Sequence, residues 1–312
     1  MKVLVTGSAG MLGSNLISSI NALEDLRGIG VGRRELDLAN PEELYDLLAT
    51  VEPDVVIHAA AKVGGIQANI ATPYDFLVSN LLLDTNVVQA SIRAGIKNLL
   101  YVGSSCMYPK NYRQPLVESD ILAAPLEPTN EGYAIAKIAA SKLCEYASLS
   151  YGLSYRVIIP SNLYGPNDNF NPGSSHLLAS VIRKVHNAKI NGDREIEVWG
   201  AGTARREYTF VRDLSSWAAK AVSGMAQLPA ALNLGIGVDH SVDELYLAAM
   251  EAIDYKVKLV HNLQMPEGMK AKLMDSSLAR EKHGWDPQTD LRTGIEQTYK
   301  WFLESKDANA RL

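Results

Sequence analysis

The stretch that decides the fold is Lys2-Val3-Leu4-Val5-Thr6-Gly7-Ser8-Ala9-Gly10-Met11-Leu12-Gly13. Its first five residues form a β-branched run that predicts a strand, and apolar residues at 12, 16, 17 and 20 predict a helix after the glycines. Glycines permit a tight turn, and the first N–H groups of a helix attract a pyrophosphate. A glycine triplet also suits an ordinary turn, but at the first strand–helix junction it favours dinucleotide binding. The predicted cofactor contacts are Gly7, Gly10, Met11, Leu12 and Gly13.

Strand and helix patterns alternate through the first half of the chain. Strands are expected at 28–32, 54–58, 98–102 and 156–160, and helices at 41–50, 73–95 and 133–151. This order predicts an α/β fold, a Rossmann-type doubly wound parallel sheet whose carboxyl edge binds ligands. The cofactor is expected to meet Asp37 and Leu38, and small residues after the third strand let it lie close, namely Ala59, Ala60 and Ala61.

The end of the second strand carries the signal for cofactor choice. No acid that would accept a ribose 2′-hydroxyl stands directly at this strand end, and Arg33 and Arg34 follow. Guanidinium groups there favour a 2′-phosphate, although two solvated loop arginines would give the same pattern. The expected cofactor is therefore NADP(H), with Arg33 as its phosphate contact.

The segment 102–137 holds most of the candidate chemistry. Tyr133 and Lys137 lie four residues apart in an expected helix, so both side chains share one face. A cation beside a phenol favours the phenolate, which lowers the phenol pKa from about 10 toward a value useful for donating a proton to a ketone oxygen. Ser104, expected at a strand end, supplies a hydroxyl for the same oxygen. A surface helix also carries such a Tyr/Lys pair by chance, so the context has to decide.

The second half of the chain differs in character. A loop of Asn, Asp, Pro, Gly and Ser at 167–175 precedes an expected helix at 175–188 and a strand at 195–199. A capping box, Ser241 with Glu244, opens a helix to about 253, and further helices are expected at 276–283 and 291–303. We expect an NADP-binding Rossmann domain at 1–165 and a smaller C-terminal α/β substrate-binding lobe at 166–312, from which the chain can return to the Rossmann sheet.

Composition narrows the class of protein. The 312 residues carry 21% charged and 47% hydrophobic residues and a net charge of -5, which gives no basic excess for a nucleic-acid partner. Only Cys106 and Cys144 are present, no apolar run reaches membrane-spanning length, and no charged-then-apolar leader opens the chain. A cytoplasmic protein without a membrane or nucleic-acid partner is expected, and no metal site is predicted. Cys144, in mid-helix, is expected in the core.

Together these residues resemble the extended short-chain dehydrogenases/reductases. The finer resemblance, which spans residues 2–304, is to the GDP-L-fucose synthase family, and it rests on the stretches 60–66, 103–110, 126–131, 133–139, 162–166 and 168–170. This resemblance implies an NADPH-dependent, two-stage enzyme. It epimerises GDP-4-keto-6-deoxy-D-mannose at C3 and C5 and then reduces the C4 ketone, which gives GDP-L-fucose.

The resemblance also implies residue roles. Cys106 is the base and His176 the acid of epimerisation, because inversion needs two groups on opposite faces of a carbon acidified by the ketone. In reduction Tyr133 protonates O4, Lys137 holds the nicotinamide ribose and Ser104 hydrogen-bonds O4. Local packing is the alternative for Cys106 and His176. The implied cofactor contacts further include Lys137, Pro160, Asn162, Leu163 and His176, and the implied substrate contacts are Ser104, Asn162, Lys184, Trp199, Arg206 and Glu267.

Two departures from the family pattern leave the substrate open. Ala9 stands where the family often has a basic residue, so Arg33 carries more of the phosphate contact, and residues 267–272 differ from the family's Asp-Gly-Thr-Pro-Arg-Lys. A relative that acts on another keto sugar, such as a 3,6-dideoxy or heptose GDP-sugar, or that reduces without epimerising, is the second hypothesis. A non-catalytic nucleotide-binding protein is the third. A homodimer is expected because helices 73–95 and 133–151 resemble those that pair in this superfamily.

Overall fold

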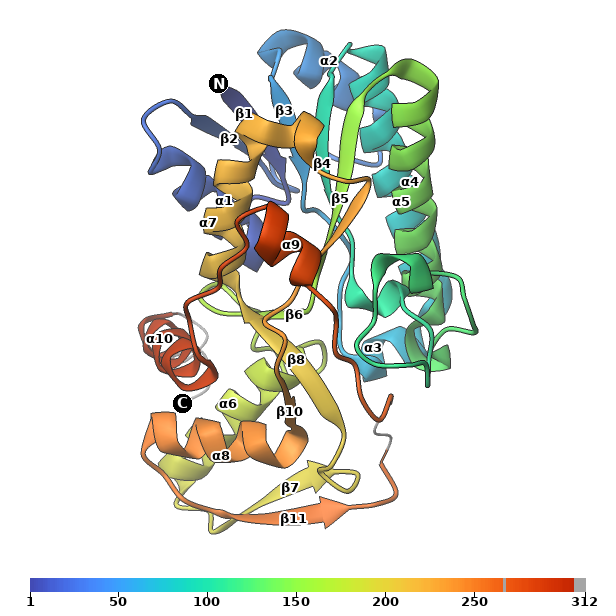
Figure 1. Cartoon of the computed structure of the whole chain (residues 1–312). Coiled ribbons are helices and arrows are strands. Elements are labelled where there is room, and N and C mark those ends of the chain that lie inside the picture. The colour runs from blue at the N-terminus through green and yellow to red at the C-terminus, as the bar shows by residue number, and fades with distance from the viewer. Residues whose placement is uncertain (266–267, 306–312) are drawn as a thin grey trace.

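A computed structural model describes residues 1–265 and 268–305 of the chain. Its centre is a six-stranded sheet in the order β2-β1-β3-β4-β5-β9, with every neighbouring pair parallel (Figure 1). The strands are β1 (Lys2–Thr6), β2 (Arg27–Val31), β3 (Val55–His58), β4 (Asn98–Val102), β5 (Ser154–Pro160) and β9 (Ala231–Leu234). The predicted Rossmann-type doubly wound sheet is therefore confirmed.

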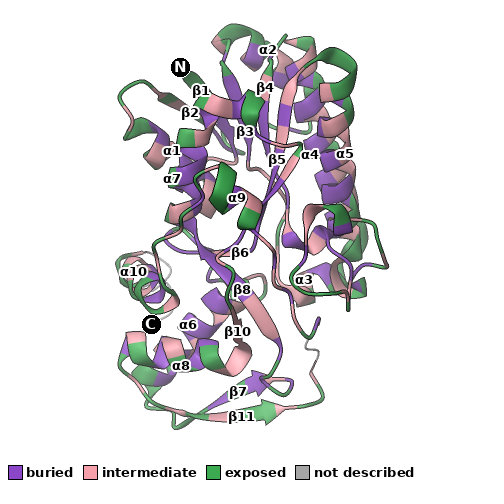
Figure 2. Ribbon diagram, in the orientation of Figure 1, coloured by how far each residue is buried: buried purple, intermediate pink, exposed green. Residues whose placement is uncertain are grey.

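Helices cover both faces of this sheet because each buried strand points successive side chains to opposite sides. Val3 and Val5 pack with residues of α1 (Met11–Asn21) and α7 (Val211–Ala221), whereas Leu4 packs on the other face. That other face is covered by α2 (Pro41–Val51), α4 (Pro73–Arg93) and α5 (Glu131–Tyr151). Figure 2 shows the buried residues along the strands and the inner sides of these helices.

Most of the polypeptide after β5 forms a second, smaller region with two sheets of its own. One small sheet joins β6 (Asn162–Tyr164), β8 (Arg205–Phe210) and β10 (Asp239–Ser241), and a parallel pair joins β7 (Glu195–Trp199) to β11 (Lys258–Asn262). They share a hydrophobic core with α6 (Leu177–Asn191), α8 (Val242–Ile253) and α10 (Leu291–Glu304). The remaining elements are α3 (Ile66–Ala71), α9 (Ser277–Lys282) and short 3₁₀ turns at Ser105–Met107, Glu118–Asp120, Pro128–Asn130 and Val222–Gln227.

Local signals position several of these helices. The Asn40 side chain accepts hydrogen bonds from the backbone of Glu42 and Glu43 at the start of α2. Ser241 and Glu244 form the predicted capping box of α8, and Gly152 ends α5 in the left-handed conformation, as expected. Cys144 is buried in the core, also as expected.

The structure adds elements that the periodicity did not reveal. The elements that were not anticipated are α3, β6, β8, α7, β9, β10 and β11. The expected helix at 175–188 begins at Leu177 and continues to Asn191. The division of the chain at residue 165 stays a prediction. β9 and α7 come from beyond it, yet β9 pairs with β5 and α7 packs against α1.

Candidate active site

A cleft of about 1470 Å³ opens at the carboxyl edge of the large sheet and continues to α6, β7 and β8. All sequence-predicted site residues that the structure describes line this one cleft: Gly7, Gly10, Met11, Leu12, Gly13, Arg33, Asp37, Leu38, Ala59, Ala60, Ala61, Ser104, Cys106, Tyr133, Lys137, Pro160, Asn162, Leu163, His176, Lys184, Trp199 and Arg206. Glu267, the remaining predicted substrate contact, lies outside the described residues. Residues up to 200 positions apart therefore meet in one place, while their roles stay predictions.

The glycine turn forms one end of the cleft. Gly7 has a φ of 72°, and its carbonyl accepts the Gly10 N–H at 2.9 Å. A β-carbon on Gly13 would lie 2.1 Å from that same carbonyl oxygen, so only glycine lets α1 approach β1 this closely. Gly10 begins α1 without a side-chain cap, which leaves the first N–H groups of the helix available. Such a turn fits the diphosphate of a dinucleotide.

The end of β2 corrects one sequence-based expectation. Arg33 and Arg34 are exposed beside the cleft, as the 2′-phosphate reading requires. Glu35, however, folds back so that its carboxylate accepts the Gly32 N–H at 2.8 Å. A β-carbon on Gly32 would meet this carboxylate at 2.8 Å and Ala9 at 3.5 Å. An acid therefore does reach the strand end, from a position three residues further along.

Ser104 directly precedes the 3₁₀ turn that follows β4, and Cys106 lies within that turn. The Cys106 N–H donates to the Ser104 hydroxyl oxygen at 3.2 Å. The Asn130 side-chain amide donates to the Cys106 sulfur at 3.1 Å, and the Lys272 ammonium lies 3.9 Å from the same sulfur. Lys272 is buried, and burial lowers the pKa of its ammonium while Cys106 opposes that shift. A cation and an amide donor thus surround the half-buried thiol.

Tyr133 and Lys137 share one face of α5, but Lys137 does not lower the phenol pKa as expected. Burial raises the pKa of Tyr133, the neighbouring Cys106 and Asp84 act in the same direction, and only interaction with Ser104 opposes them. The Lys137 ammonium lies 6.0 Å from the Tyr133 ring centre and donates instead to the Val102 carbonyl at 3.1 Å. It also lies 3.9 Å from Asp84, whose charge offsets its own.

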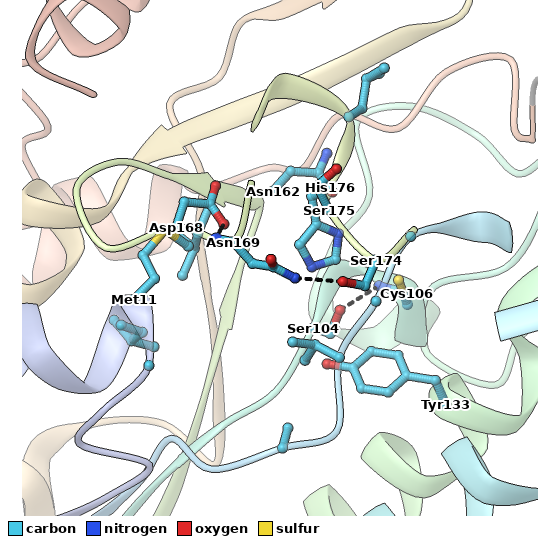
Figure 3. Close-up of a pocket in the computed structure, with 18 of the residues that line it drawn as sticks. Met11, Ser104, Cys106, Tyr133, Asn162, Asp168, Asn169, Ser174, Ser175 and His176 are labelled. Atoms are coloured by element: carbon cyan, nitrogen blue, oxygen red, sulfur yellow. Dashed lines mark hydrogen bonds between the residues drawn. The ribbon is translucent and has the colours of Figure 1, made fainter. Parts of the chain in front are cut away.

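His176 is the N-cap residue that directly precedes α6, on the wall opposite Tyr133. Figure 3 shows its imidazole on one side of the cleft and the Tyr133 phenol on the other, with Ser104 and Cys106 between them. The loop before His176 is pressed against Gly65, where a β-carbon would lie 2.8 Å from the Ser175 carbonyl oxygen. The surrounding protein lowers the pKa of His176, and the Lys272 charge lowers it further.

The far end of the cleft is lined by the other predicted substrate residues. Lys184 donates to the Glu197 carbonyl at 2.9 Å and lies 5.8 Å from the centre of the Trp199 ring. Arg206 is half-buried on β8, and Asn162 donates its side-chain amide to the Glu207 carbonyl at 3.0 Å. An aromatic face and two cations at one end suit the base and diphosphate of a nucleotide sugar.

Several cleft residues were not identified as site residues from the sequence, among them Glu35, Asn130, Asp168 and Lys272. Asn130 and Lys272 lie in the segments 126–131 and 267–272, which were compared with the GDP-L-fucose synthase family. Only the fold shows that both side chains contact the Cys106 sulfur. Asp168 is buried, and that burial raises the pKa of its carboxyl to about 7. No pattern marks such long-range contacts. Across residues 1–265 and 268–305, no cluster of three side chains suited to a metal ion is present.

No helix among the described residues has the length and apolar character needed to cross a membrane.

Comparisons with known proteins agree on the family. The model of the NAD dependent epimerase/dehydratase family matches residues 3–235. The chain is 39% identical to the GDP-L-colitose synthase of Yersinia pseudotuberculosis, covering 98% of this chain and 99% of that protein. It is 41% identical to the GDP-L-fucose synthase of Azorhizobium caulinodans, with 98% and 97% covered.

Solved structures share the whole fold. A GDP-6-OMe-4-keto-L-xylo-heptose reductase from Campylobacter jejuni superposes with a TM-score of 0.91 at 27% identity, with 97% of each chain covered. MlghC, a GDP-mannoheptose C4 reductase from the same organism with NADP bound, gives a TM-score of 0.86 at 28% identity, with 96% and 98% covered. The chain therefore belongs to the NAD dependent epimerase/dehydratase family of extended short-chain dehydrogenases/reductases and, within it, to the group of GDP-L-fucose synthases and their relatives.

Proposed function

We propose that this protein converts GDP-4-keto-6-deoxy-D-mannose to GDP-L-fucose, by epimerisation at C3 and C5 followed by NADPH-dependent reduction of the C4 ketone. The observation that carries the proposal is the meeting of Cys106 and His176 with Ser104 and Tyr133 in one cleft. Epimerisation and reduction both depend on the C4 ketone of one bound sugar, so the acids and bases of both reactions have to surround the same sugar ring.

The cleft residues fit an NADP(H) cofactor. The glycine turn with its free N–H groups suits the diphosphate, and the exposed Arg33 suits a 2′-phosphate. Ala60 and Lys137 both line the cleft. Ala60 belongs to the wall of small residues that would take the dinucleotide, and Lys137 would hold the nicotinamide ribose. Bound NADPH supplies the hydride for C4. The NADP in the similar MlghC structure supports the same assignment.

The first stage uses Cys106 and His176 as base and acid. The C4 ketone acidifies the hydrogens on C3 and C5. A thiolate can therefore take the proton from one face of the carbon and become a thiol, while an imidazolium donates a different proton to the opposite face and becomes a neutral imidazole. The Asn130 side-chain amide and the Lys272 ammonium both approach the Cys106 sulfur, at 3.1 Å and 3.9 Å. The two groups reach the cleft from different elements, as inversion requires.

In the second stage Tyr133 and Ser104 act on the ketone oxygen. The phenol donates a proton to O4 while the Ser104 hydroxyl holds that oxygen in place. Because burial raises the pKa of Tyr133, the phenol is protonated before reaction and ready to donate. Lys184, Trp199 and Arg206 hold the GDP portion at the far end of the cleft.

A second candidate is the same chemistry, or reduction alone, on a related GDP-keto sugar. Two observations favour it. Similar proteins are named as GDP-L-colitose synthase and as reductases of GDP-heptoses, and Met269 and Lys270 depart from the family pattern beside the substrate end of the cleft. A non-catalytic nucleotide-binding role is the weakest reading, because Ser104, Tyr133 and Lys137 are all in place.

The protein is further proposed to be a cytoplasmic homodimer that takes no nucleic acid or membrane as its partner. Large apolar side chains are exposed along the outer sides of α4 and α5: Tyr74, Leu82, Ile135, Tyr146, Leu149 and Tyr151. A second copy that packs its own α4 and α5 there would cover them. Sedimentation of wild-type protein beside a Leu149→Glu/Tyr151→Lys variant tests this, since the variant is expected to sediment as a monomer.

The experiment that tests the function is incubation with GDP-4-keto-6-deoxy-D-mannose and NADPH in deuterated water, followed by NMR of the product. GDP-L-fucose labelled at C3 and C5 is expected. Cys106→Ser is expected to lose the label, whereas Cys144→Ser, a substitution at the other cysteine, is expected to keep it. A reduced sugar without label would remove the roles of Cys106 and His176. No turnover, together with turnover of a 3,6-dideoxy or heptose GDP-sugar, would establish the second candidate.

A further inference from the structure

A chain of buried polar side chains lies next to Lys137. The Thr6 hydroxyl lies 2.7 Å from His58 Nδ1, and His58 Nε2 lies 2.9 Å from Asp84 Oδ1. The Tyr101 hydroxyl donates to Asp84 Oδ2 at 2.6 Å, and the Lys137 ammonium lies 3.9 Å from that oxygen. The first four side chains are fully buried, and Lys137 is 2% exposed.

The hydrogen bonds of this network fit one arrangement of protons. The Ala60 N–H donates to the Thr6 hydroxyl oxygen at 3.3 Å, so that hydroxyl can donate onward to His58 Nδ1. His58 Nε2–H then donates to Asp84, which also accepts from Tyr101. In this arrangement His58 Nδ1 accepts, His58 Nε2 donates, and both oxygens of the ionised Asp84 accept, so every one of these atoms has a partner. The network thus runs from Ala60, in the cofactor wall, through β1, β3, α4 and β4 to α5.

Asp84 is the anionic member of this network, and Lys137 is its cation. Burial alone would raise the pKa of Asp84, but the Lys137 charge and the hydrogen bonds from His58 and Tyr101 outweigh burial and hold that pKa below its usual value. Burial lowers the pKa of Lys137, and Asp84 opposes this shift more than the nearby Cys144 does. The other groups that face the ammonium are the Tyr101 ring at 4.5 Å, the Tyr133 ring at 6.0 Å and the Val102 carbonyl at 3.1 Å.

We propose that Asp84, held by His58 and Tyr101, is a positioning residue that keeps Lys137 protonated and fixed beneath the catalytic Tyr133. This inference rests on the proposed function, since it gives Lys137 a task in reduction. A lone buried ammonium would shed its proton, and a neutral amine would attract neither the ribose hydroxyls nor developing charge on the phenol. A buried ion pair is weak evidence for a role in stability alone, because apolar residues of similar volume often replace such pairs without loss. The position of the pair, between the cofactor wall and Tyr133, points to a role in the reaction.

The first test removes the charge of Asp84 and keeps its shape. In Asp84→Asn, Lys137 is expected to lose its proton at a lower pH, so the fall of kcat for ketone reduction on the alkaline side moves down by at least about one unit. At a pH above the alkaline midpoints of both proteins, the variant is then about tenfold slower than wild type. Asp84→Glu, which keeps the charge, is expected to retain the wild-type pH profile even where its kcat is lower. Ser91→Ala removes another buried polar group of α4, one without a hydrogen-bond partner among the described residues, and is expected to change neither the profile nor the rate.

The second test needs no cofactor and no turnover. Thermal unfolding of the apoprotein from pH 6 to pH 9 compares wild type with Asp84→Asn. A buried lysine without a counter-charge binds fewer protons in the folded state than in the unfolded state, so the stability deficit of Asp84→Asn is expected to shrink as pH rises. The double variant Asp84→Asn/Lys137→Met removes both charges. It is expected to be more stable than Asp84→Asn and to show no such pH dependence.

These measurements separate failure of the inference from failure of the proposed function. Wild-type protein that reduces no keto sugar would refute the function, while the apoprotein experiment would still decide whether Asp84 holds the Lys137 charge. An active Asp84→Asn with an unshifted pH profile would overturn the inference, as would an equal loss of activity at every pH. If Asp84→Asn does not fold, the double variant Asp84→Asn/Lys137→Met still tests the inference. A double variant that is no more stable than Asp84→Asn would overturn the inference too.

Discussion

Substituting Gly13 by Ala tests how tightly the glycine turn is built. The added β-carbon would lie 2.1 Å from the Gly7 carbonyl oxygen, 2.6 Å from the Gly7 carbonyl carbon and 2.8 Å from Ser8 Cα. All three contacts are to backbone, so no flexible side chain can move aside. A carbon and an oxygen normally stay roughly 3.2 Å apart, so α1 has to shift by about 1 Å relative to β1.

A shift of that size is large on the scale of a hydrogen bond. An N–H that donates to a diphosphate oxygen at about 2.9 Å would then lie at about 3.9 Å, where no hydrogen bond remains. Losing two such bonds to a charged group costs about 3–6 kcal/mol, so NADPH is expected to bind at least about 100-fold more weakly. Crowding between α1 and β1 is expected to lower the free energy of unfolding by about 1–3 kcal/mol as well.

Fluorescence titration with NADPH and thermal unfolding measure the two effects separately. Gly192→Ala is the matched control. Gly192 follows α6 with a φ of 73° and has nothing within 4 Å of its added β-carbon, so Ala there strains the backbone without a clash. It is expected to cost about 1 kcal/mol of stability and to leave NADPH affinity unchanged. A Gly13→Ala protein that binds NADPH within threefold of wild type would refute the assignment of this turn to the diphosphate.

Three further predictions concern cofactor choice, a buried carboxyl and the epimerisation acid. Arg33→Ala should reduce the preference for NADPH over NADH about tenfold or more. Glu35→Ala should increase that preference, because it removes an anion beside the 2′-phosphate. An unchanged ratio of kcat/KM for the two cofactors would contradict both assignments. Burial raises the pKa of Asp168 to about 7, so its contribution to stability is lost as pH rises from about 4 through 7. Asp168→Asn should therefore raise the melting temperature at pH 8 more than at pH 5. An equal rise at both pH values, or a larger rise at pH 5, would argue against a raised pKa of this buried carboxyl. The surrounding protein and the Lys272 charge lower the pKa of His176 below the usual value of an imidazole, about 6.5. Deuterium entry at the carbon that His176 protonates should therefore fall as pH rises through that lowered pKa, and a flat profile from pH 5 to 8 would exclude His176 as that acid.

The first half of the fold could be predicted because each signal there is local. The strand at Lys2–Thr6, the glycine turn and the capped helices follow from residues a few positions apart. β8 escaped prediction because its sequence, Arg-Arg-Glu-Tyr-Thr-Phe, buries a glutamate where alternation predicts an apolar side chain. That carboxylate accepts N–H bonds from Gly237 and Met274, so its burial depends on chain segments 30 or more residues away. No window around β8 contains that information.

The same distinction runs through the candidate site. Sequence patterns singled out Ser104, Cys106, Tyr133 and Lys137, whose roles stay predictions, because all four fall within recognisable local motifs. Those patterns did not identify the charged and polar groups that contact these residues. Lys272 approaches the Cys106 sulfur from 166 residues further along the chain, a distance over which no periodicity persists.

The Tyr133–Lys137 pair shows how neighbouring groups that the sequence does not reveal change the expected pKa of a motif residue. Four-residue spacing placed the two side chains on one face of α5 and led to a lowered phenol pKa, yet burial raises it and the lysine charge is directed toward Asp84. A phenol that stays protonated is the better form for a group that must give a proton to O4. In the proposed reaction, Lys137 therefore serves less to lower the phenol pKa before reaction than to provide a fixed charge when the phenolate forms. On this reasoning Asp84 matters as much as the spacing of the motif, because its charge is the main influence that opposes the lowering of the Lys137 pKa by burial.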